Sequence, residues 1–248
     1  MNNSEPFPRL LSMGLTGLLV SFSDTLSEPA NRAAIAFRAR LDRESWPGLE
    51  ETSATLASVF MRFDPRHVSP AALSEQVNGL LAETDWYKAA LPEGRKLWRI
   101  PTVYGGPQAP QLDEAAALAG VAPDVAIEQL SSARVRVLTL GYAPGQPYLG
   151  TLPENWNLPR QTALTPTVPP GALVVAVRQF VMFASQAPTG WRHVGQTGFR
   201  CFVPEADTPF TLRAGDEVIF PAVSPEDFAN RAAQDPAGLG GASFEVLP

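Results

Sequence analysis

The sequence contains very little cysteine and histidine. Its 248 residues include one cysteine, Cys201, and two histidines, His67 and His193. A single thiol excludes a disulfide framework or a cysteine-based zinc site within one chain. The two histidines lie far apart in sequence and do not suggest a histidine-rich metal site. We therefore expect no metal centre.

Basic clusters and long hydrophobic runs are also missing. The formal net charge is −6 and the sequence pI ≈ 5.0, which argues against nucleic acid and anionic membranes as partners. The apolar stretch Leu10–Phe22 is interrupted by glycine, serine and threonine and is too short to cross a bilayer. Residues 1–8 carry no positive side chain, unlike a secretory signal. We expect a cytoplasmic protein.

Several common site motifs are absent from the sequence. There is no phosphate loop of the Gly-x-x-x-x-Gly-Lys-Ser/Thr type, no Gly-x-Gly-x-x-Gly after a strand, and no Gly-x-Ser-x-Gly elbow. We expect His67, which follows Asp64-Pro-Arg, to lie in solvent, and His193 offers only a weak candidate for catalysis. Cys201 lies on a predicted strand and is expected to be a small buried hydrophobe.

Proline, by contrast, is abundant. The chain has 25 prolines, and hydrophobic residues make up 45% of it. This composition predicts a real core with many turns and short strands. The length fits one large domain or two small ones.

Residues 1–93 are predicted to form a small α+β domain of ferredoxin-like type. Its expected helices each begin with a cap residue before a proline, Ser27 or Glu28 in the first and Ser69 in the second. The expected elements are strands at Arg9–Ser12 and Gly17–Phe22, a helix over Pro29–Asp42, a strand over Thr52–Asp64 and a helix from Pro70 to Glu83. Residues 89–95 read as a linker.

Residues 94–248 are predicted to form a second, β-rich domain. Two short helices are expected, at Leu112–Leu118 and Pro123–Leu130. Strands are expected at Leu97–Tyr104, Val135–Leu140, Leu173–Val177, Gln179–Phe183, Phe199–Val203, Phe210–Leu212 and Glu217–Phe220. Short strands separated by regular turn signals indicate an all-β barrel or sandwich.

The most unusual segment is the loop from Gly141 to Gly150, which contains Tyr142, Pro144, Gly145 and Tyr148. Its glycines let the backbone approach a ligand, and its prolines fix the loop in advance. It is a candidate ligand loop, although an ordered crossover needed only for folding would look the same.

Three further residues are candidates for ligand binding. Trp191 follows a Pro/Gly turn and is either a binding platform or a core anchor. Arg160 and Arg178 are candidate anion ligands, because guanidinium matches carboxylate and phosphate geometry. Ordinary surface charge is the alternative for both.

These segments resemble the KipI family, whose members are also called PxpB, the B-type component of 5-oxoprolinase, or allophanate hydrolase subunit 1. The resemblance covers nearly the whole chain. It is carried by Tyr104-Gly-Gly with Leu112-Asp-Glu after it, the loop Leu140-Gly-Tyr-Ala-Pro-Gly-x-Pro-Tyr-Leu-Gly150, Pro159-Arg160, Val168-Pro-x-Gly171, Pro188-x-Gly-Trp191 and Leu212-Arg-x-Gly-Asp216.

The resemblance implies a small α+β domain followed by a cyclophilin-like β-barrel, related to the carboxyltransferase part of urea carboxylase. It also implies a KipA/PxpC-like partner (allophanate hydrolase subunit 2). With a third, PxpA-like subunit, such pairs are associated with ATP-dependent opening of 5-oxoproline to glutamate. We expect no tightly bound cofactor and no activity from the isolated chain. Whether ATP contacts this chain stays open.

By the same resemblance, the barrel cleft would hold a small amide or carboxylate, or would position an activated phosphate. The expected ligand-binding residues are Tyr104, Tyr142, Pro144, Gly145, Tyr148, Arg160, Arg178, Gln179 and Trp191. No catalytic residue is assigned.

The chain departs from the family pattern at several positions. Leu130 replaces a histidine, Gln146 a phenylalanine and Gln186 an acidic residue, while Thr165 falls where the family has a second Pro-Arg pair. Val177 and Val181 replace glycines, and Arg178 is new, a hypothetical substitute for a lost arginine. Several of these changes remove a titratable side chain, which implies either an altered substrate or a subunit that binds without catalysing.

Other functions stay open beside the enzyme subunit. A KipI-type regulatory module that inhibits a histidine kinase would need an exposed apolar patch on the barrel. A cyclophilin-type peptidyl-prolyl isomerase rests on fold analogy alone and is disfavoured.

Overall fold

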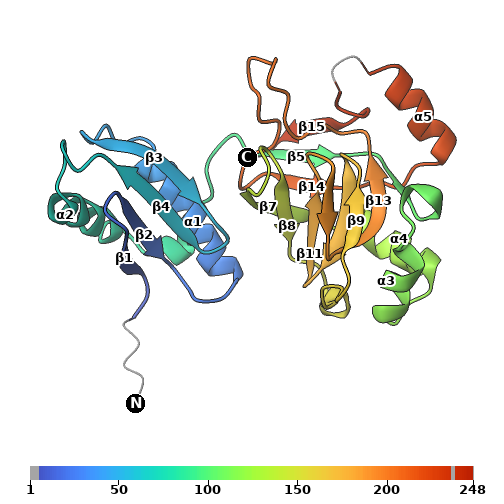
Figure 1. The fold of residues 1–248 in the computed structure, drawn as a ribbon, viewed down its shortest axis with the longest axis horizontal. Helices are drawn as coiled ribbons and strands as arrows, with labels where there is room; N and C mark the ends of the chain where they lie inside the picture. Colours follow the sequence, from blue (N-terminus) through green and yellow to red (C-terminus); the bar gives the residue numbers. More distant parts are fainter. Residues whose placement is uncertain (1–5, 236–237, 248) are drawn as a thin grey trace. The chain divides into compact units, whose positions relative to one another are not determined.

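The computed structural model describes residues 6–235 and 238–247. The chain divides into two compact units, Met1–Glu93 and Gly94–Pro248. Both units combine helices with β-sheet (Figure 1). The predicted mixture of α and β structure is therefore confirmed, whereas the ferredoxin-like and cyclophilin-like assignments stay predictions.

The first unit contains a four-stranded antiparallel sheet and two α-helices. Its elements are β1 (Arg9–Met13), β2 (Gly17–Ser21), α1 (Glu28–Leu41), β3 (Leu49–Ala54), β4 (Ser58–Phe63), α2 (Pro70–Leu81) and the 3₁₀ turn η1 (Trp86–Lys88). Both helices begin with a serine cap: the Ser27 hydroxyl accepts from the Ala30 N–H, and the Ser69 hydroxyl from the Ala72 N–H. Alternate residues of β2 and β4 pack against α1 in one core.

One strand prediction in this unit is wrong. The segment Thr52–Asp64 was expected to be a single strand, but it belongs to a hairpin of β3 and β4. The turn between them closes with a 2.8 Å hydrogen bond from the Thr55 N–H to the Ser58 carbonyl. This turn contains neither glycine nor proline, so the usual sequence signal for a hairpin is missing.

The strand order of the first sheet is β1-β2-β4-β3. The helix α1 connects β2 to β3, and β4 lies between them, which is the split β-α-β arrangement. A ferredoxin-like domain would place its last strand beside β2. Here β1, which comes first in the chain, fills that position.

The second unit is built on a nine-stranded sheet with the order β15-β5-β14-β7-β8-β11-β10-β13-β6 and a separate pair, β12-β9. Its strands are β5 (Lys96–Arg99), β6 (Thr102–Tyr104), β7 (Val135–Leu140), β8 (Pro147–Gly150), β9 (Thr165–Val168), β10 (Ala172–Ala176), β11 (Gln179–Met182), β12 (Ala187–Thr189), β13 (Arg192–Thr197), β14 (Glu217–Ile219) and β15 (Ser243–Val246). Its helices are α3 (Leu112–Leu118), α4 (Pro123–Ser132) and α5 (Pro225–Ala233), with 3₁₀ turns η2 (Gly106–Gln108) and η3 (Glu154–Trp156).

The large sheet curls on itself, as Figure 1 shows. The predicted strand Leu97–Tyr104 is interrupted at Pro101 and forms both β5 and β6, which lie near opposite ends of the sheet order. The residues between β5 and β6 lie beside the segment that follows β14. The Ile100 N–H donates to Ile219 and the Thr102 N–H to Pro221, both at 2.9 Å. The two ends of the sheet therefore meet, which gives the barrel-like shape.

Both faces of β10 are buried. Leu173 and Val175 point into the main core of the unit. Val174 and Ala176 point the other way, into a smaller apolar cluster that includes Phe183. The outer side of the curled sheet is therefore covered at this place instead of facing solvent.

Two other predicted strands, Phe199–Val203 and Phe210–Leu212, form only isolated bridges, between Phe202 and Phe210 and between Phe199 and Leu239. Pro204 and Pro209 flank the connection and have no backbone donor, which limits the ladder. The elements β8, β9, β12, β13, β15 and α5 were not predicted.

The turn between β10 and β11 is strained. Val177 and Arg178 both have positive φ, 45° and 61°, where a hairpin usually has Asn-Gly. A β-branched side chain is especially unfavourable in this region.

We therefore predict that Val177→Asn stabilises the protein by about 1 kcal/mol, because asparagine tolerates a left-handed backbone. Chemical denaturation measures the change. Val125→Asn is the matched control, since Val125 in α4 is 37% exposed and Val177 is 38% exposed, and it should leave stability nearly unchanged. A less stable Val177→Asn protein would contradict the prediction.

Candidate functional site

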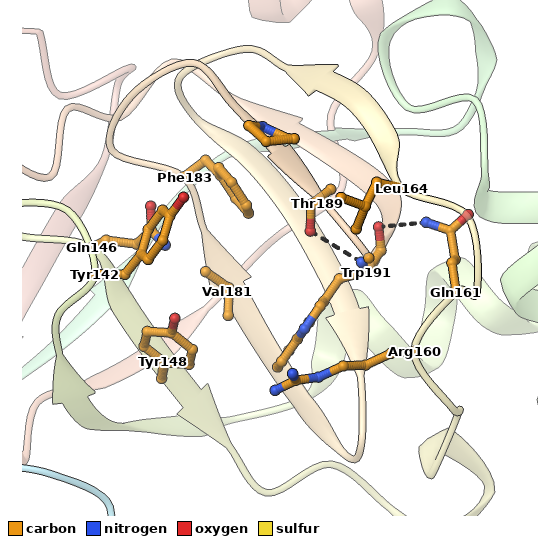
Figure 2. A pocket seen from close by; sticks show the side chains of 12 residues that line it. Tyr142, Gln146, Tyr148, Arg160, Gln161, Leu164, Val181, Phe183, Thr189 and Trp191 are labelled. Atoms are coloured by element: carbon orange, nitrogen blue, oxygen red, sulfur yellow. Dashed lines mark hydrogen bonds between the residues drawn. The ribbon is translucent and has the colours of Figure 1, made fainter.

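A cavity of about 410 Å³ opens on the outer face of the curled sheet (Figure 2). Its walls come from the loop before β8, from β8 and β11, from the segment before β9, and from the end of β12. The lining residues are Tyr142, Gln146, Tyr148, Arg160, Gln161, Leu164, Val181, Phe183, Pro188, Thr189, Gly190 and Trp191. This volume suits a small organic ligand.

The deep part of the cavity is apolar. Val181, Phe183 and Trp191 are all at least 90% buried and belong to the outer apolar cluster. The rings of Tyr148 and Trp191 meet edge to face with centroids 6.3 Å apart. Trp191 is therefore both a core anchor and a wall of the cavity.

Arg160 is the one charged residue that lines the cavity. Its guanidinium lies 5.7 Å from the Trp191 ring centroid, a cation–π distance. No lining residue is acidic, and within residues 6–235 and 238–247 Arg160 forms no ion pair. The cavity therefore carries an uncompensated positive charge, which favours an anionic ligand.

A set of hydrogen bonds fixes the segment that carries Arg160. The Gln161 N–H donates to the Gly190 carbonyl at 2.7 Å, and the Gln161 amide donates to the Trp191 carbonyl at 3.0 Å. On the other side, Arg192 donates to the Pro159 carbonyl at 2.7 Å. Bonds to both neighbours of Arg160 hold its backbone against the wall that contains Trp191.

Gln111, at the start of α3, extends this set. Its amide donates to the Gln161 side chain at 2.7 Å, and its Oε1 accepts from the His193 N–H at 2.9 Å. The Thr165 hydroxyl bonds both glutamines. Sequence reasoning missed Gln111, Gln161 and Thr189. Gln161 could have been found from its place beside Arg160, and Thr189 from its place in the motif that ends at Trp191.

Four of the sequence-predicted site residues come together in this cavity: Tyr142, Tyr148, Arg160 and Trp191. Pro144 and Gly145 lie in the same loop but do not line the cavity. Gly145 has a φ of +74°, and a Cβ there would lie 2.6 Å from the Cys201 carbonyl oxygen. Its role is to let the loop pack closely on the backbone beneath it.

The other three predicted residues lie elsewhere. The buried Tyr104 hydroxyl donates to the Phe220 carbonyl at 2.9 Å, and burial raises its pKa. Gln179 is buried at the start of β11, paired with Gly150.

Arg178 donates to the Leu152 carbonyl at 2.8 Å and forms a 2.6 Å ion pair with Glu154. It borders a different cavity of about 480 Å³, beside Gln129, Ser132, Arg134 and Leu152. Its charge is already matched by Glu154, so it does not substitute for an arginine in the cavity of Figure 2.

The histidines and the cysteine lie outside the cavity. His67 is exposed beside Asp64, as expected. His193 is 5% exposed, and burial lowers its pKa. Cys201 is 1% exposed, as expected for a buried hydrophobe, and burial raises its pKa to about 12. No group of three or more potential metal ligands occurs in the part of the chain that the structure describes.

The departures from the family pattern fall into different environments. Gln146 and Val181 line the cavity, and Thr165 joins the glutamine network beside it. Leu130 is fully buried in the main core and faces neither cavity. Gln186 is exposed.

The curled sheet has a barrel-like shape with a cavity on its outer face, and comparison with known proteins assigns its class. A TM-score of 0.71 relates it to the urea carboxylase of Kluyveromyces lactis, over 98% of this chain and 25% of that chain, and the 15% identity makes this a likeness of fold alone. The chain belongs to the family "carboxyltransferase domain, subdomain C and D", whose model matches residues 8–212.

Two closer comparisons refine this assignment. The chain is 27% identical to the B-type subunit of 5-oxoprolinase from Bacillus subtilis (strain 168), over 87% of this chain and 93% of that protein. It is 30% identical to TTHA0988, with a TM-score of 0.71 over 84% of this chain, and it spans 40% of the TTHA0988 chain. Over the described residues, no helix is both long and apolar enough to cross a membrane.

The burial of Cys201 gives a simple test of the fold around the ligand loop. At about pH 8 a thiol with so high a pKa is almost wholly protonated, so an aromatic disulfide reagent should not label the native protein. One equivalent should react after denaturation. Gln186→Cys adds an exposed thiol as a positive control. Rapid labelling of the native wild-type protein would show that the loop does not pack on Cys201 as described.

Proposed function

We propose that this chain is the B-type subunit of a 5-oxoprolinase-like complex in the cytoplasm, one that uses ATP to hydrolyse 5-oxoproline to glutamate. Its partners would be a KipA/PxpC-like subunit and a PxpA-like subunit. The names of its relatives support the subunit class. The specific reaction, the partners and the location are our proposal.

The observation that carries the proposal is the unpaired Arg160 in a cavity without a carboxylate. A ligand carboxylate would receive charge-assisted hydrogen bonds from this guanidinium. The apolar wall of Val181, Phe183 and Trp191 would cover the rest of a small ring. 5-Oxoproline has both parts, a carboxylate and a compact five-membered ring.

The same cavity discriminates by charge. A free amino acid carries an ammonium group, and no lining side chain offers it a carboxylate. Desolvating an unpaired ammonium is costly. The nitrogen of 5-oxoproline is a neutral lactam, so the cavity should prefer 5-oxoproline to proline and should hold the product glutamate weakly.

The cavity does not explain the hydrolysis itself. None of its lining residues is an aspartate, glutamate, histidine or cysteine, the usual groups for general acid–base or nucleophilic catalysis. In our proposal the partner subunits supply those groups. ATP would be used by the complex, with no cofactor held tightly by this chain. The isolated chain would then bind substrate and remain inactive.

We predict that Arg160→Gln weakens 5-oxoproline binding. Loss of hydrogen bonds to a charged group corresponds to about 1.5–3 kcal/mol, or about 10- to 150-fold in Kd. Titration calorimetry on the chain, alone and mixed with its C-type partner, measures the change.

Arg200→Gln is the matched control for this prediction. Arg200 is also exposed, but it pairs with Glu205 and does not line the cavity. Equal affinities of the wild-type and Arg160→Gln proteins would remove Arg160 from the ligand site. Tighter binding of proline than of 5-oxoproline would contradict the charge argument.

The second prediction concerns the complex. With purified A-type and C-type partners, glutamate release from 5-oxoproline should require both ATP and this chain. The chain alone should release none. A stable complex with full activity in the absence of this chain would overturn the proposed role.

A further inference from the structure

Gln146 lies at the end of the loop before β8, and the residue is only 2% exposed. It ends the loop that begins at Gly141, and its backbone closes that loop. The Gly141 N–H donates to the Gln146 carbonyl at 3.0 Å, and the Gln146 N–H donates to the Ala143 carbonyl at 3.1 Å. These two bonds fix the backbone of Gln146 within the loop.

The orientation of the amide is fixed as well. The Gln146 Oε1 accepts a hydrogen bond from the Ala184 N–H at 3.3 Å. A backbone N–H requires an acceptor, so the oxygen and not the nitrogen must face Ala184. The Nε2 group, which can donate twice, is then left for the cavity that Gln146 lines.

This donor has no partner within the described part of the chain. Over residues 6–235 and 238–247, the Gln146 Nε2 makes no hydrogen bond to the protein. The Gln146 Nε2 is not a fully buried atom, so it opens onto the cavity and can donate to a ligand there. The neighbouring Val181 and Phe183 side chains offer it no acceptor. Figure 2 shows Gln146 and Arg160 on opposite sides of Val181.

We infer that Gln146 determines specificity by donating a hydrogen bond to a carbonyl oxygen of a ligand whose carboxylate is bound by Arg160. The ligand class is a small carboxylic acid that carries a lactam, amide or keto oxygen away from its carboxylate. This inference rests on the proposed function, in which the lactam oxygen of 5-oxoproline is that acceptor.

Two ligands, which differ only in the ring lactam with its carbonyl oxygen and its N–H, test this hydrogen bond in combination with the Gln146 variants. 5-Oxoproline and cyclopentanecarboxylate share a carboxylate on a five-membered ring, and neither carries a positive charge. Only 5-oxoproline has the carbonyl oxygen. A site with a donor placed for this oxygen should bind 5-oxoproline about 10-fold more tightly than cyclopentanecarboxylate.

Gln146→Glu removes the donor and keeps an acceptor for the Ala184 N–H. The added charge weakens the binding of both carboxylates alike. The measured quantity is therefore the Kd of cyclopentanecarboxylate divided by the Kd of 5-oxoproline. We expect this ratio to fall from about 10 to about 1. Gln146→Met tests the same loss without added charge. Gln186→Glu, at an exposed position away from the cavity, should keep the wild-type ratio.

The outcomes separate this inference from the proposed function. A wild-type chain that binds neither ligand, alone or with its C-type partner, would overturn the proposed function and this inference with it. Binding of 5-oxoproline with a ratio near 1 in the wild type, or a ratio near 10 that persists in folded Gln146→Glu and Gln146→Met proteins, would overturn the role of Gln146 alone. Thermal melts establish that each variant is folded.

Discussion

The candidate site depends on the burial of β10 on both faces. An antiparallel sheet commonly presents one face to water, and the residues of β10 would then alternate between apolar and polar. Instead all five residues of this strand, Ala172–Ala176, are buried. Leu173 and Val175 stabilise the interior, while Val174 and Ala176 support a second apolar layer outside the sheet. That outer layer supplies a dry wall against which a small ligand and a guanidinium can lie.

Within the described part of the chain, Arg160 keeps an unpaired charge, whereas the nearby arginines Arg192 and Arg178 are paired with carboxylates. Arg192 is matched by Glu114 at 2.8 Å and holds the Pro159 carbonyl. Its charge is neutralised, and its geometry positions the segment that contains Arg160. Arg178 similarly pairs with Glu154 and secures the residues after β8. Arg160 is exposed, lines the cavity and forms no ion pair with the described residues, so its charge is available to a ligand.

Much of this arrangement could be predicted from local sequence, and the rest depended on distant contacts. Serine-proline caps marked the helices α1 and α2, and alternating apolar residues marked β7. The hairpin of β3 and β4 was missed because its turn lacks glycine and proline. The loop with Tyr142 and Tyr148 was found from its composition, and Arg160 and Trp191 from their motifs. Gln111 could not be found this way, since its importance comes from bonds to Gln161 and His193, 50 and 82 residues further on.

The residues that depart from the expected family pattern lie in two kinds of environment. Some lie in the core or in a turn, and others line the cavity. Leu130 fills the main core, and Val177 occupies the strained turn between β10 and β11, so these two residues concern packing and backbone strain. Gln146 and Val181 face the cavity. One side of the cavity carries Arg160 and Trp191, and the opposite side carries the amide of Gln146. The Ala184 N–H orients this amide, which leaves its Nε2 as a donor on that side of the cavity. Under the proposed function, Arg160 would bind the carboxylate of the ligand and Gln146 the carbonyl oxygen at its other end.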